Sequence, residues 1–458
     1  MIVLEFNELC SELISRFMAR GLLPGFSALH QRSTVYTTDA GEKPPNLDPW
    51  IQWPSVHSGM TFSQHRIVNL GDGCTLREKC IAELLSDAGV PVGVFGSMNM
   101  NYRNLRGYFL PDPWHKVGTA SPAALQPYYE IISKQVQESS RSDALTLTDM
   151  TRLGWFMVRN GLTVGSVKAA ARQLLEERRD AGIAWRRASV LDDLQYDVFR
   201  CLNRRHQVRF ATFFCNSTAH YQHYYWRSMQ PQSFQHGAPD GEHASLATAI
   251  QHGYQSMDRL IQRALHDYPD AVIVLCTALS QRPWDTTKCT YRPVEFESLL
   301  SFAGIPTESV VVKPVMAEQF YLDFVSAEAA RQAEVALRAL YLEDRPLMYV
   351  SREGDQTLFC GCDITEAQLF DRQVTRRPHG ASKAFNELFY IIHTVRSGRH
   401  DPLGSFWLGN GHHEVVAEPI PITDIAPTIL EHFGLESPAY MHGVSVWPRI
   451  VRKMSATA

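Results

Sequence analysis

Two histidines stand three residues apart just after a predicted buried strand. The strand spans 210–215, and the segment NSTAHYQHYYW that follows it carries His220 and His223. This spacing places both imidazoles on one face of a helix. Imidazole has an unperturbed pKa of about 6.5, so it serves as an acid, a base or a metal ligand near neutral pH. We interpret His223 as either a second ligand beside His220 or a polar surface residue.

A second group of reactive side chains lies in a long segment rich in Gly, Pro, Ser and Asp. The segment TTDAGEKPPNLDPWIQWPSVHSGMTFSQHRI contains Ser55, His57 and Ser58, and long loops within compact domains are often functional. A hydroxyl near an imidazole suits nucleophilic or acid–base catalysis. The alternative is a loop whose Ser and His side chains make only local hydrogen bonds.

The predicted strand VIVLC at 272–276 ends at residues with little catalytic capacity. Its continuous apolar run indicates a strand covered on both faces, and catalytic groups in such sheets usually follow the carboxyl end. Here that position holds Cys276, Thr277 and Ala278. None of the three is a strong acid, a strong base or a ligand for a hard metal ion.

Further strands and helices must position these residues. A strand at 2–6 is followed by Asn7 and by a helix whose apolar residues recur at helical spacing. The segment 121–206 is rich in helix formers, which indicates a helical insert, and 290–365 alternates strand and helix signals, which indicates a small α/β insert. The predicted core therefore comprises 1–120, 207–289 and 366–458, interrupted by inserts at 121–206 and 290–365.

Composition limits the classes of partner. The 458 residues include 44 basic and 48 acidic side chains, a formal charge of −4, so no general basic field favours nucleic acid or an anionic membrane. No apolar run reaches the roughly 18 residues that span a bilayer. The start MIVLEFNELC lacks a basic leader, and the nine cysteines lack paired CxxC spacing. These features predict a cytoplasmic protein with reduced thiols that binds neither nucleic acid nor membrane.

Several segments match the motifs of one enzyme superfamily in the correct order. IVLEFNELCSELISRFMARGLLPGFSALHQRST corresponds to an opening strand and helix, and QWPSVHSGMTFSQHRI to a nucleophile loop. NSTAHYQHYYW corresponds to a DxxxH metal motif, and VIVLCTAL to a strand that ends in SDHG. GNGHHEVVAEPIPITDIAPTIL corresponds to a last metal-binding His and the helix after it. In these segments the chain resembles the alkaline phosphatase superfamily, particularly its branch of type I phosphodiesterases and nucleotide pyrophosphatases.

The resemblance implies a fold and the position of a site. The expected fold is α/β, with a mainly parallel sheet sandwiched by helices, a helical insert and a small α/β insert. Enzymes of this family bind two divalent ions, usually zinc, between carboxylates and histidines, and a Thr or Ser attacks phosphorus. The resemblance places the corresponding positions of this chain at the carboxyl ends of the strands, within the roughly 15 Å width of a ligand pocket. These positions are Asn7, Gln52, Asn216, His220, Thr277 and His412.

Most of the implied metal ligands are replaced in this chain. Asn7 and Asn216 stand where the resemblance implies aspartates, and Gln52 stands at the nucleophile position. Thr277 and Ala278 replace the Asp and His of SDHG, so that His220 and His412 alone match. Neutral side chains do not offset the four positive charges of two divalent ions in a partly dry pocket. The sequence therefore predicts no dinuclear zinc centre and no ordinary phosphodiesterase activity.

Three hypotheses remain for the site. The first is an enzyme that works without metals, with imidazoles in acid and base roles. The second is a site that retains one weakly bound divalent ion, and the third is a pseudoenzyme that binds a ligand or a partner protein. The expected ligand is an anionic small molecule, a phosphate- or sulfate-bearing compound or a sugar conjugate. The candidate catalytic residues are His220, His412, His57 and Ser55. The candidate metal ligands are His220 and His412. The candidate substrate contacts are Asn7, Gln52, Asn216 and Thr277.

Overall fold

The structure of the chain is a computed structural model. It describes residues 1–458 except 116–117, 138–145, 236–241, 287, 316–317, 367–368, 370, 379, 394–395 and 448–458. In this described part, no helix has both the length and the apolar character that crossing a bilayer requires.

A central sheet organises the described part of the chain. Its nine strands are β1 (Ile2–Phe6), β2 (Thr34–Asp39), β3 (Val92–Phe95), β4 (Gly107–Leu110), β5 (Phe210–Cys215), β6 (Ile273–Cys276), β19 (Leu403–Gly409), β20 (Glu414–Val415) and β21 (Ile420–Pro421). The order is β20-β2-β19-β6-β1-β5-β3-β4, and β21 also pairs with β2. Strand β19 runs antiparallel to both of its neighbours, whereas the other pairs are parallel. The carboxyl ends of β1, β5 and β6 therefore meet at one edge of the sheet, where β19 begins.

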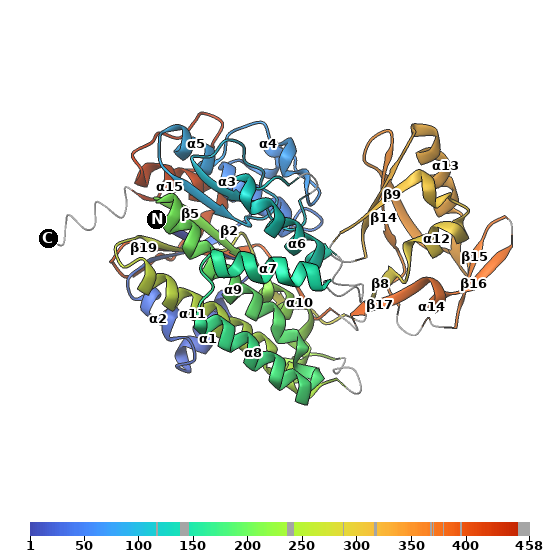
Figure 1. Ribbon diagram of the computed structural model, residues 1–458, viewed down its shortest axis with the longest axis horizontal. Helices are drawn as coiled ribbons and strands as arrows, with labels where there is room; N and C mark the ends of the chain where they lie inside the picture. Colours follow the sequence, from blue (N-terminus) through green and yellow to red (C-terminus); the bar gives the residue numbers. More distant parts are fainter. Residues whose placement is uncertain are drawn as a thin grey trace.

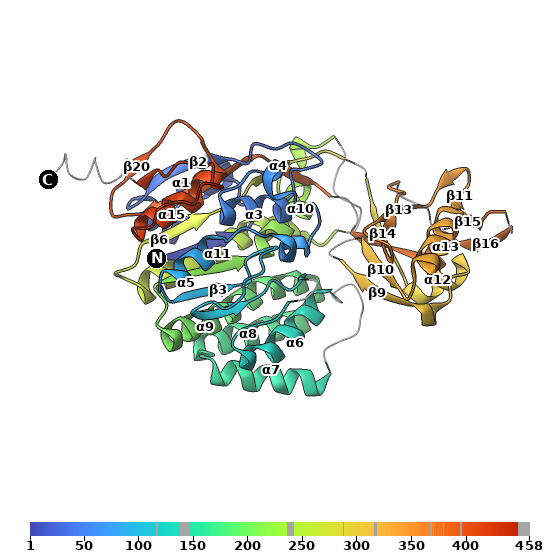
Figure 2. The same cartoon turned by 90° about the horizontal axis from the view of Figure 1, so that it is seen from above.

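Helices cover both faces of this sheet (Figures 1 and 2). One face packs on α1 (Ser11–Ala19), α2 (Pro24–His30), α9 (Arg187–His206), α10 (Ser217–Met229) and α11 (Ala249–Asp267). The other packs on α3 (Pro49–Ser58), α5 (Ile81–Asp87) and α15 (Ile425–His432). The predicted α/β class, with a mainly parallel sheet between helices, is confirmed.

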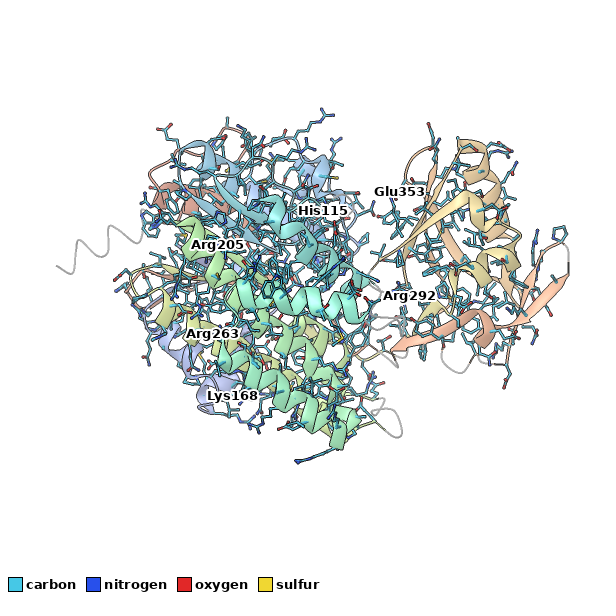
Figure 3. All side chains as sticks on the ribbon, viewed as in Figure 1. His115, Lys168, Arg205, Arg263, Arg292 and Glu353 are labelled. Carbon is cyan, nitrogen blue, oxygen red and sulfur yellow. The ribbon has the colours of Figure 1, made fainter. Side chains whose placement is uncertain are left out.

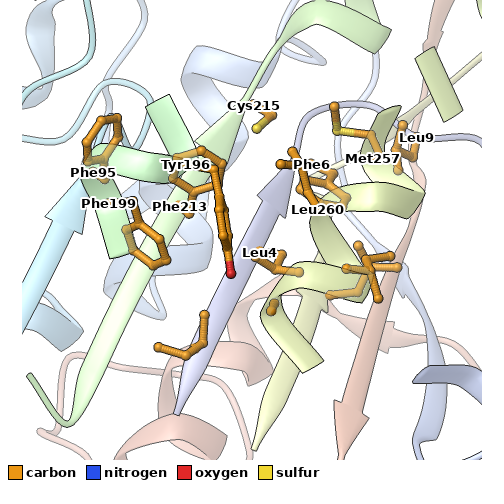
Figure 4. Packing of buried hydrophobic residues seen from close by; sticks show 14 of the residues in the cluster. Leu4, Phe6, Leu9, Phe95, Tyr196, Phe199, Phe213, Cys215, Met257 and Leu260 are labelled. Carbon is orange, nitrogen blue, oxygen red and sulfur yellow. The ribbon is translucent and has the colours of Figure 1, made fainter. Parts of the chain in front are cut away.

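The alternation of side chains along β1 divides the core into two layers. Leu4 and Phe6 join the apolar cluster under α9 and α11, together with Phe213 of β5 (Figure 4). Val3 joins the cluster on the opposite face. Because full burial of each such side chain contributes about 1.5–3 kcal/mol, this strand fixes the position of the residues that follow it.

The predicted helical insert is partly a layer of the core. In the described residues it consists of α6 (Gln126–Gln137), α7 (Leu147–Arg159), α8 (Val164–Arg179) and α9. The rings of Phe199 on α9 and Phe213 on β5 lie 4.9 Å apart between centroids, and Leu202 is fully buried in the same cluster. The interpretation of all of 121–206 as an insert is therefore corrected, because α9 packs directly on the sheet.

A second unit with its own apolar core follows β6. Its elements are β8 (Thr290–Pro293), α12 (Phe296–Ala303), β9 (Val310–Pro314), β10 (Phe320–Phe324), α13 (Ala327–Arg338), β11 (Leu340–Leu342), β12 (Arg345–Pro346), β13 (Met348–Arg352), β14 (Thr357–Cys362), β15 (Gln373–Arg376), β16 (Ala381–Ala384), α14 (Phe385–Leu388) and β17 (Phe389–His393). Figures 1 and 2 both place this unit to one side of the main body. Its apolar cluster extends from Cys289 to Phe389, and β17 pairs with β8. The predicted end at residue 365 is therefore corrected to β17, because strands after 365 close the unit.

Two antiparallel strands connect the second unit to the core. β7 (Ser280–Pro283) leaves the carboxyl end of β6, and its partner β18 (Gly398–Asp401) leads back into β19. The unit also contacts the core where Asn69 Nδ2 donates a hydrogen bond to Glu353 Oε2 at 2.9 Å. Figure 3 shows Glu353 on the side of the unit that faces the main body. The second unit thus joins the chain beside the carboxyl edge of the sheet.

The predicted nucleophile loop contains a helix. The segment Pro49–Ser58 forms α3, followed by the short helix α4 (Phe62–His65). The boundaries of α3 have ordinary signals: Asp48 precedes it, Pro49 is its first residue, and Gly59 ends it at a φ of 65°. The prediction of a long loop is corrected, and this helix fixes Gln52, Ser55 and His57 as buried residues.

Candidate functional site

A cluster of three metal-ligand residue types lies at the carboxyl edge of the sheet. It consists of Glu8, His223 and His400, whose ligand atoms all lie within 4.8 Å of one another. Glu8 Oε2 lies 3.1 Å from His223 Nε2 and 3.4 Å from His400 Nε2. Glu8 follows β1 by two residues, His223 lies on α10 and His400 on β18. Three distant segments of the sequence therefore supply one cluster.

The backbone and the carboxylate of Glu8 are both held in place. Its φ is 60°, a left-handed conformation that is uncommon for residues other than glycine. Gln222 Nε2 donates to the Glu8 backbone oxygen at 2.6 Å. Asn7 Nδ2 donates to Glu8 Oε1 at 2.8 Å, and Gln281 Nε2 donates to Oε2. These bonds aim the carboxylate at the two histidines.

The ring of His400 has a defined orientation. Its Nδ1 lies 2.8 Å from the Leu47 carbonyl oxygen and 3.1 Å from Asp48 Oδ1. Both partners only accept, so Nδ1 carries a hydrogen and Nε2 is directed at Glu8. In contrast, His223 Nδ1 has no hydrogen-bond partner among the described residues. His223 and His400 are 21% and 17% exposed, whereas Glu8 is 2% exposed, so the cluster opens on its imidazole side.

The charges in the cluster favour the protonated, cationic form of His400. Burial opposes protonation of this residue, but Glu8 and Asp48 together raise its pKa to about 10. Burial likewise opposes ionisation of Glu8, yet His223 and His400 hold the pKa of that carboxyl far below its usual range. Burial lowers the pKa of His223 despite the neighbouring Glu8. The cluster thus combines an ionised carboxylate, a neutral imidazole and a position that stabilises positive charge.

Arg396 extends the cluster toward the second unit. Its guanidinium hydrogen-bonds Tyr224 and interacts with Glu318 and Asp48, while its Nε has no hydrogen-bond partner among the described residues. Burial, His223 and Arg396 together lower the pKa of His220 to about 4. Arg396 therefore lies close enough to α10 to place positive charge beside the histidines.

Asn7 and Asn216 meet at this edge as the sequence predicts. Asn7 Nδ2 donates to Asn216 Oδ1 at 2.8 Å, and Asn7 Oδ1 accepts from Trp53 Nε1 at 2.9 Å. His220, one turn further along α10, packs its ring 5.0 Å from the ring of Tyr224. The structure thus brings three of the candidate residues to the carboxyl edge.

Thr277 also follows a strand end at this edge, but its side chain and that of Gln52 are bound to other parts of the protein. Thr277 is fully buried, and its Oγ1 accepts from the backbone nitrogen of Ser405 on β19 at 2.8 Å. Gln52 is also fully buried, and its Nε2 donates to the Asn46 carbonyl at 2.8 Å. Neither side chain has exposed surface, so the prediction that they contact substrate is corrected.

His412 lies at the opposite edge of the sheet. It follows Gly409, which pairs with Ile273 at the start of β6. By contrast, Asn7 follows the carboxyl end of β1, a five-residue strand about 16 Å long. The prediction that His412 joins the site is therefore corrected, because β19 runs antiparallel and carries the residues after it away from the carboxyl edge.

Ser55 has an imidazole neighbour, but one in the wrong tautomer for a base. Ser55 Oγ lies 3.0 Å from His65 Nε2, and His65 Nδ1 accepts from the backbone nitrogen of Ile67 at 3.0 Å. A neutral ring that accepts at Nδ1 carries its hydrogen at Nε2. Burial lowers the pKa of His65 to about 4, so the ring stays neutral and donates to Ser55. Consequently His65 does not remove a proton from this hydroxyl.

His57 belongs to a buried network below the site. Its Nε2 lies 2.9 Å from Glu5 Oε1, and its Nδ1 lies 3.0 Å from the Tyr102 hydroxyl. His57 and Glu5 are each 1% exposed, and by strand alternation Glu5 points to the face opposite Phe6. A substrate at the carboxyl edge does not reach this ring, so His57 is corrected from a catalytic candidate to a core residue.

The residues at the implied dinuclear positions do not fit two divalent ions. Asn7, Asn216 and Thr277 supply no carboxylate, and each side chain is already bound to another amide or to backbone. Ala278 supplies no ligand atom and is fully buried. Two of the potential ligands, Glu8 and His223, lie one position after Asn7 and three positions after His220. The observed cluster therefore uses different residues from the dinuclear site that the resemblance implies.

Sequence reasoning missed Glu8, Asp48 and His400. Glu8 directly follows Asn7, and RHD at 399–401 ends one residue before a buried strand. The available signal was an acidic residue or a histidine next to the end of a strand. Whether His400 reaches the carboxyl edge depends on the direction of β19, which the local sequence does not specify.

Comparisons with known proteins give one further set of findings. No protein-family model and no curated protein matches the sequence. Solved structures similar to the chain include murine ectonucleotide pyrophosphatase/phosphodiesterase 5, with 10% identity, a TM-score of 0.43 and coverage of 98% of both chains. The alkaline phosphatase PafA has 11% identity and a TM-score of 0.47, with 97% of this chain and 98% of that chain covered.

A third similar structure is phosphonoacetate hydrolase from Sinorhizobium meliloti 1021. It has 13% identity and a TM-score of 0.39, with 93% of each chain covered. These three proteins belong to the alkaline phosphatase superfamily, which the sequence motifs also resemble. All three TM-scores are below 0.5.

Proposed function

We propose that this protein binds a phosphate- or sulfate-bearing small molecule, or such a sugar conjugate, at the carboxyl edge of its sheet and hydrolyses it there. The proposed enzyme works without the dinuclear metal centre of the family that its sequence resembles. The observation that carries this proposal is the convergence of Glu8, His223, His400 and Arg396 at one partly open edge.

Arg396 is the proposed contact for the anionic group. A guanidinium suits the planar, multidentate recognition of phosphate or sulfate oxygens. Its Nε is buried and makes no hydrogen bond within the described residues, and its charge acts on His220 and His223. An anion bound at this guanidinium is thereby held beside the cluster.

The position of the second unit favours the proposal of a small ligand at this edge. Glu318 of this unit interacts with Arg396 and with Tyr224 of α10. Both connections of the unit, through β7 and β18, adjoin the cluster. A pocket between a sheet edge and an added unit is a frequent place for small-molecule binding.

A second candidate function is a binding module without turnover, and the geometry at Ser55 favours it. The hydroxyl accepts from His65, so this ring does not activate it, and Gln52 is not a nucleophile. A chain that holds an anion but lacks an activated nucleophile binds its ligand without cleaving it.

Thermal unfolding of the full chain with inorganic phosphate, sulfate and nitrophenyl phosphate and sulfate esters tests the proposal. Ligand at 100 times its dissociation constant adds about 2.7 kcal/mol to the free energy of unfolding. We expect stabilisation by these anions in the wild type and in the control Arg399→Gln, whose side chain is exposed on β18, but not in Arg396→Gln.

Release of nitrophenol in the same samples separates the two candidates. Turnover that is lost in Arg396→Gln supports the hydrolase, and stabilisation without turnover supports the binding module. Equal stabilisation of Arg396→Gln and wild type, or no effect of any anion, contradicts the proposal.

A further inference from the structure

We propose that Glu8, His223 and His400 bind a single divalent transition-metal ion, most favourably zinc. The inference rests on the proposed function, because it names the cofactor of the same site. The ion differs from a dinuclear centre in number and in ligand residues, and it does not use Asn7, Asn216 or Thr277.

The spacing of Glu8 Oε2 from each histidine nitrogen matches one ion, and all three ligand atoms lie within 4.8 Å of one another. Two ligands of a tetrahedral ion with bonds of about 2.0–2.1 Å are about 3.3 Å apart. Glu8 Oε2 lies 3.1 Å from His223 Nε2 and 3.4 Å from His400 Nε2. An ion beside Glu8 Oε2 would therefore lie within reach of either histidine, and closing the gap between the two imidazoles would bring in the third ligand.

The partners of His400 are those of a metal-bound imidazole. A ligating histidine usually donates its second ring N–H to a carbonyl or a carboxylate, which fixes the ring and increases its basicity. His400 Nδ1 has both partners, Leu47 O at 2.8 Å and Asp48 Oδ1 at 3.1 Å. Its Nε2 consequently presents a lone pair toward Glu8 when the ring is neutral.

The backbone and carboxylate of Glu8 are held in place by neighbouring side chains. A non-glycine residue at φ 60° is uncommon and persists where surrounding structure requires it. Here Gln222, Asn7 and Gln281 hold its backbone and carboxylate. These bonds by themselves keep the carboxylate directed toward the two imidazoles.

The ligand set selects the class of ion. Two imidazoles and one carboxylate are typical of catalytic zinc sites, which keep a fourth position open. Calcium and magnesium prefer sets made mainly of oxygen ligands. When bound, the ion would polarise a phosphoryl or sulfuryl oxygen, and Arg396 of this chain would orient the same anion.

Calorimetric titration of zinc into the chelator-treated full chain tests the inference. We expect one equivalent of zinc to bind, and a visible absorption spectrum of four-coordinate type with cobalt(II). His223→Ala should weaken binding at least 100-fold, as should Glu8→Gln and His400→Ala. His223 is the safest of these for folding, because it is 21% exposed and its Nδ1 makes no hydrogen bond in the described structure.

His412→Ala is the matched control and should keep the affinity of the wild type, because this histidine lies at the other edge of the sheet. Absence of zinc binding overturns the inference, as does binding that survives His223→Ala but is lost in His220→Ala. Circular dichroism of each variant establishes that it is folded.

Failure here is distinguishable from failure of the proposed function. Zinc binding is measured without any ester, and the anion effect at Arg396 is measured in chelator-treated protein. Zinc binding without stabilisation by anions supports the metal site and contradicts the proposed function. Stabilisation by anions without zinc binding supports the proposed function and contradicts the metal site.

Discussion

The Nε2 atom of His400 lies 3.4 Å from the Oε2 atom of Glu8. The two residues come from opposite ends of the chain and meet where β1 ends and β19 is about to begin. This relationship moves the candidate site away from His412, and it brings Asp48 into the site through the other ring nitrogen of His400.

Asp48→Asn should weaken zinc binding by about 10- to 100-fold, because the partner of a ligating imidazole controls its orientation and basicity. Asp48 is 27% exposed and its side chain does not cap α3, so the fold should be retained. The measurement is the zinc affinity by titration calorimetry. Asp401→Asn, on the same strand as His400, is the control, and an equal loss in both variants would argue against a specific role of Asp48.

Ser55→Ala should leave any ester turnover within about twofold of the wild type. The hydroxyl accepts a hydrogen bond from His65 and is 2% exposed, so its loss should cost only about 1 kcal/mol of stability. Steady-state rates and urea unfolding of the variant provide the measurement. A rate loss of 100-fold or more in a folded variant would show that Ser55 is a nucleophile after all.

Asn7→Asp should destabilise the protein by roughly 1–3 kcal/mol and should not restore a dinuclear centre. The substitution replaces the amide nitrogen that donates to Glu8 and Asn216 by a carboxylate oxygen, so two acidic groups then face each other. Denaturant unfolding at pH 7 checks the loss. Two equivalents of zinc in this variant, with unchanged stability, would contradict the hydrogen-bond account.

Asp192→Asn should flatten the pH dependence of stability below neutrality. Burial raises the pKa of Asp192 to about 7, although the Ser217 hydroxyl donates to its carboxyl. Between about pH 4 and pH 7, Asp192 therefore keeps its proton in the native state but has lost it in the unfolded state. Stability contributed by the neutral form is present below about pH 4 and declines as the pH rises to about 7, by on the order of 4 kcal/mol.

The free energy of unfolding at several pH values between 4 and 8 measures this effect. The wild type should lose stability across the window relative to Asp192→Asn, in which the Ser217 contact can persist through the amide oxygen. Parallel pH profiles of the two proteins would indicate that Asp192 is ionised in the folded state.

The strands and helices of the core were predictable from local patterns. β1 and β5 have the predicted bounds of 2–6 and 210–215. These elements are decided by apolar runs and by turn residues, which are local in sequence. The helix α3 was missed because its Pro, Ser and Gly content is also typical of loops.

The site could be predicted only in part, since it depends on pairing between distant strands. Asn7, Asn216 and His220 follow parallel strands or the helix after one, and the sequence order places them at one edge. His412 and His400 lie on opposite sides of β19, so the antiparallel direction of that strand decides which of them reaches the site. No local pattern in 403–409 specifies this direction.

The most direct test of the proposed metal and anion sites is an anomalous difference map from crystals of the full chain soaked with cobalt(II) and tungstate. We expect one cobalt peak bonded to Glu8 Oε2, His223 Nε2 and His400 Nε2, with tungstate between the cobalt and Arg396. Cobalt at Asn7, Asn216 and Thr277, or at His412, or tungstate bound away from the carboxyl edge, would contradict the proposed sites.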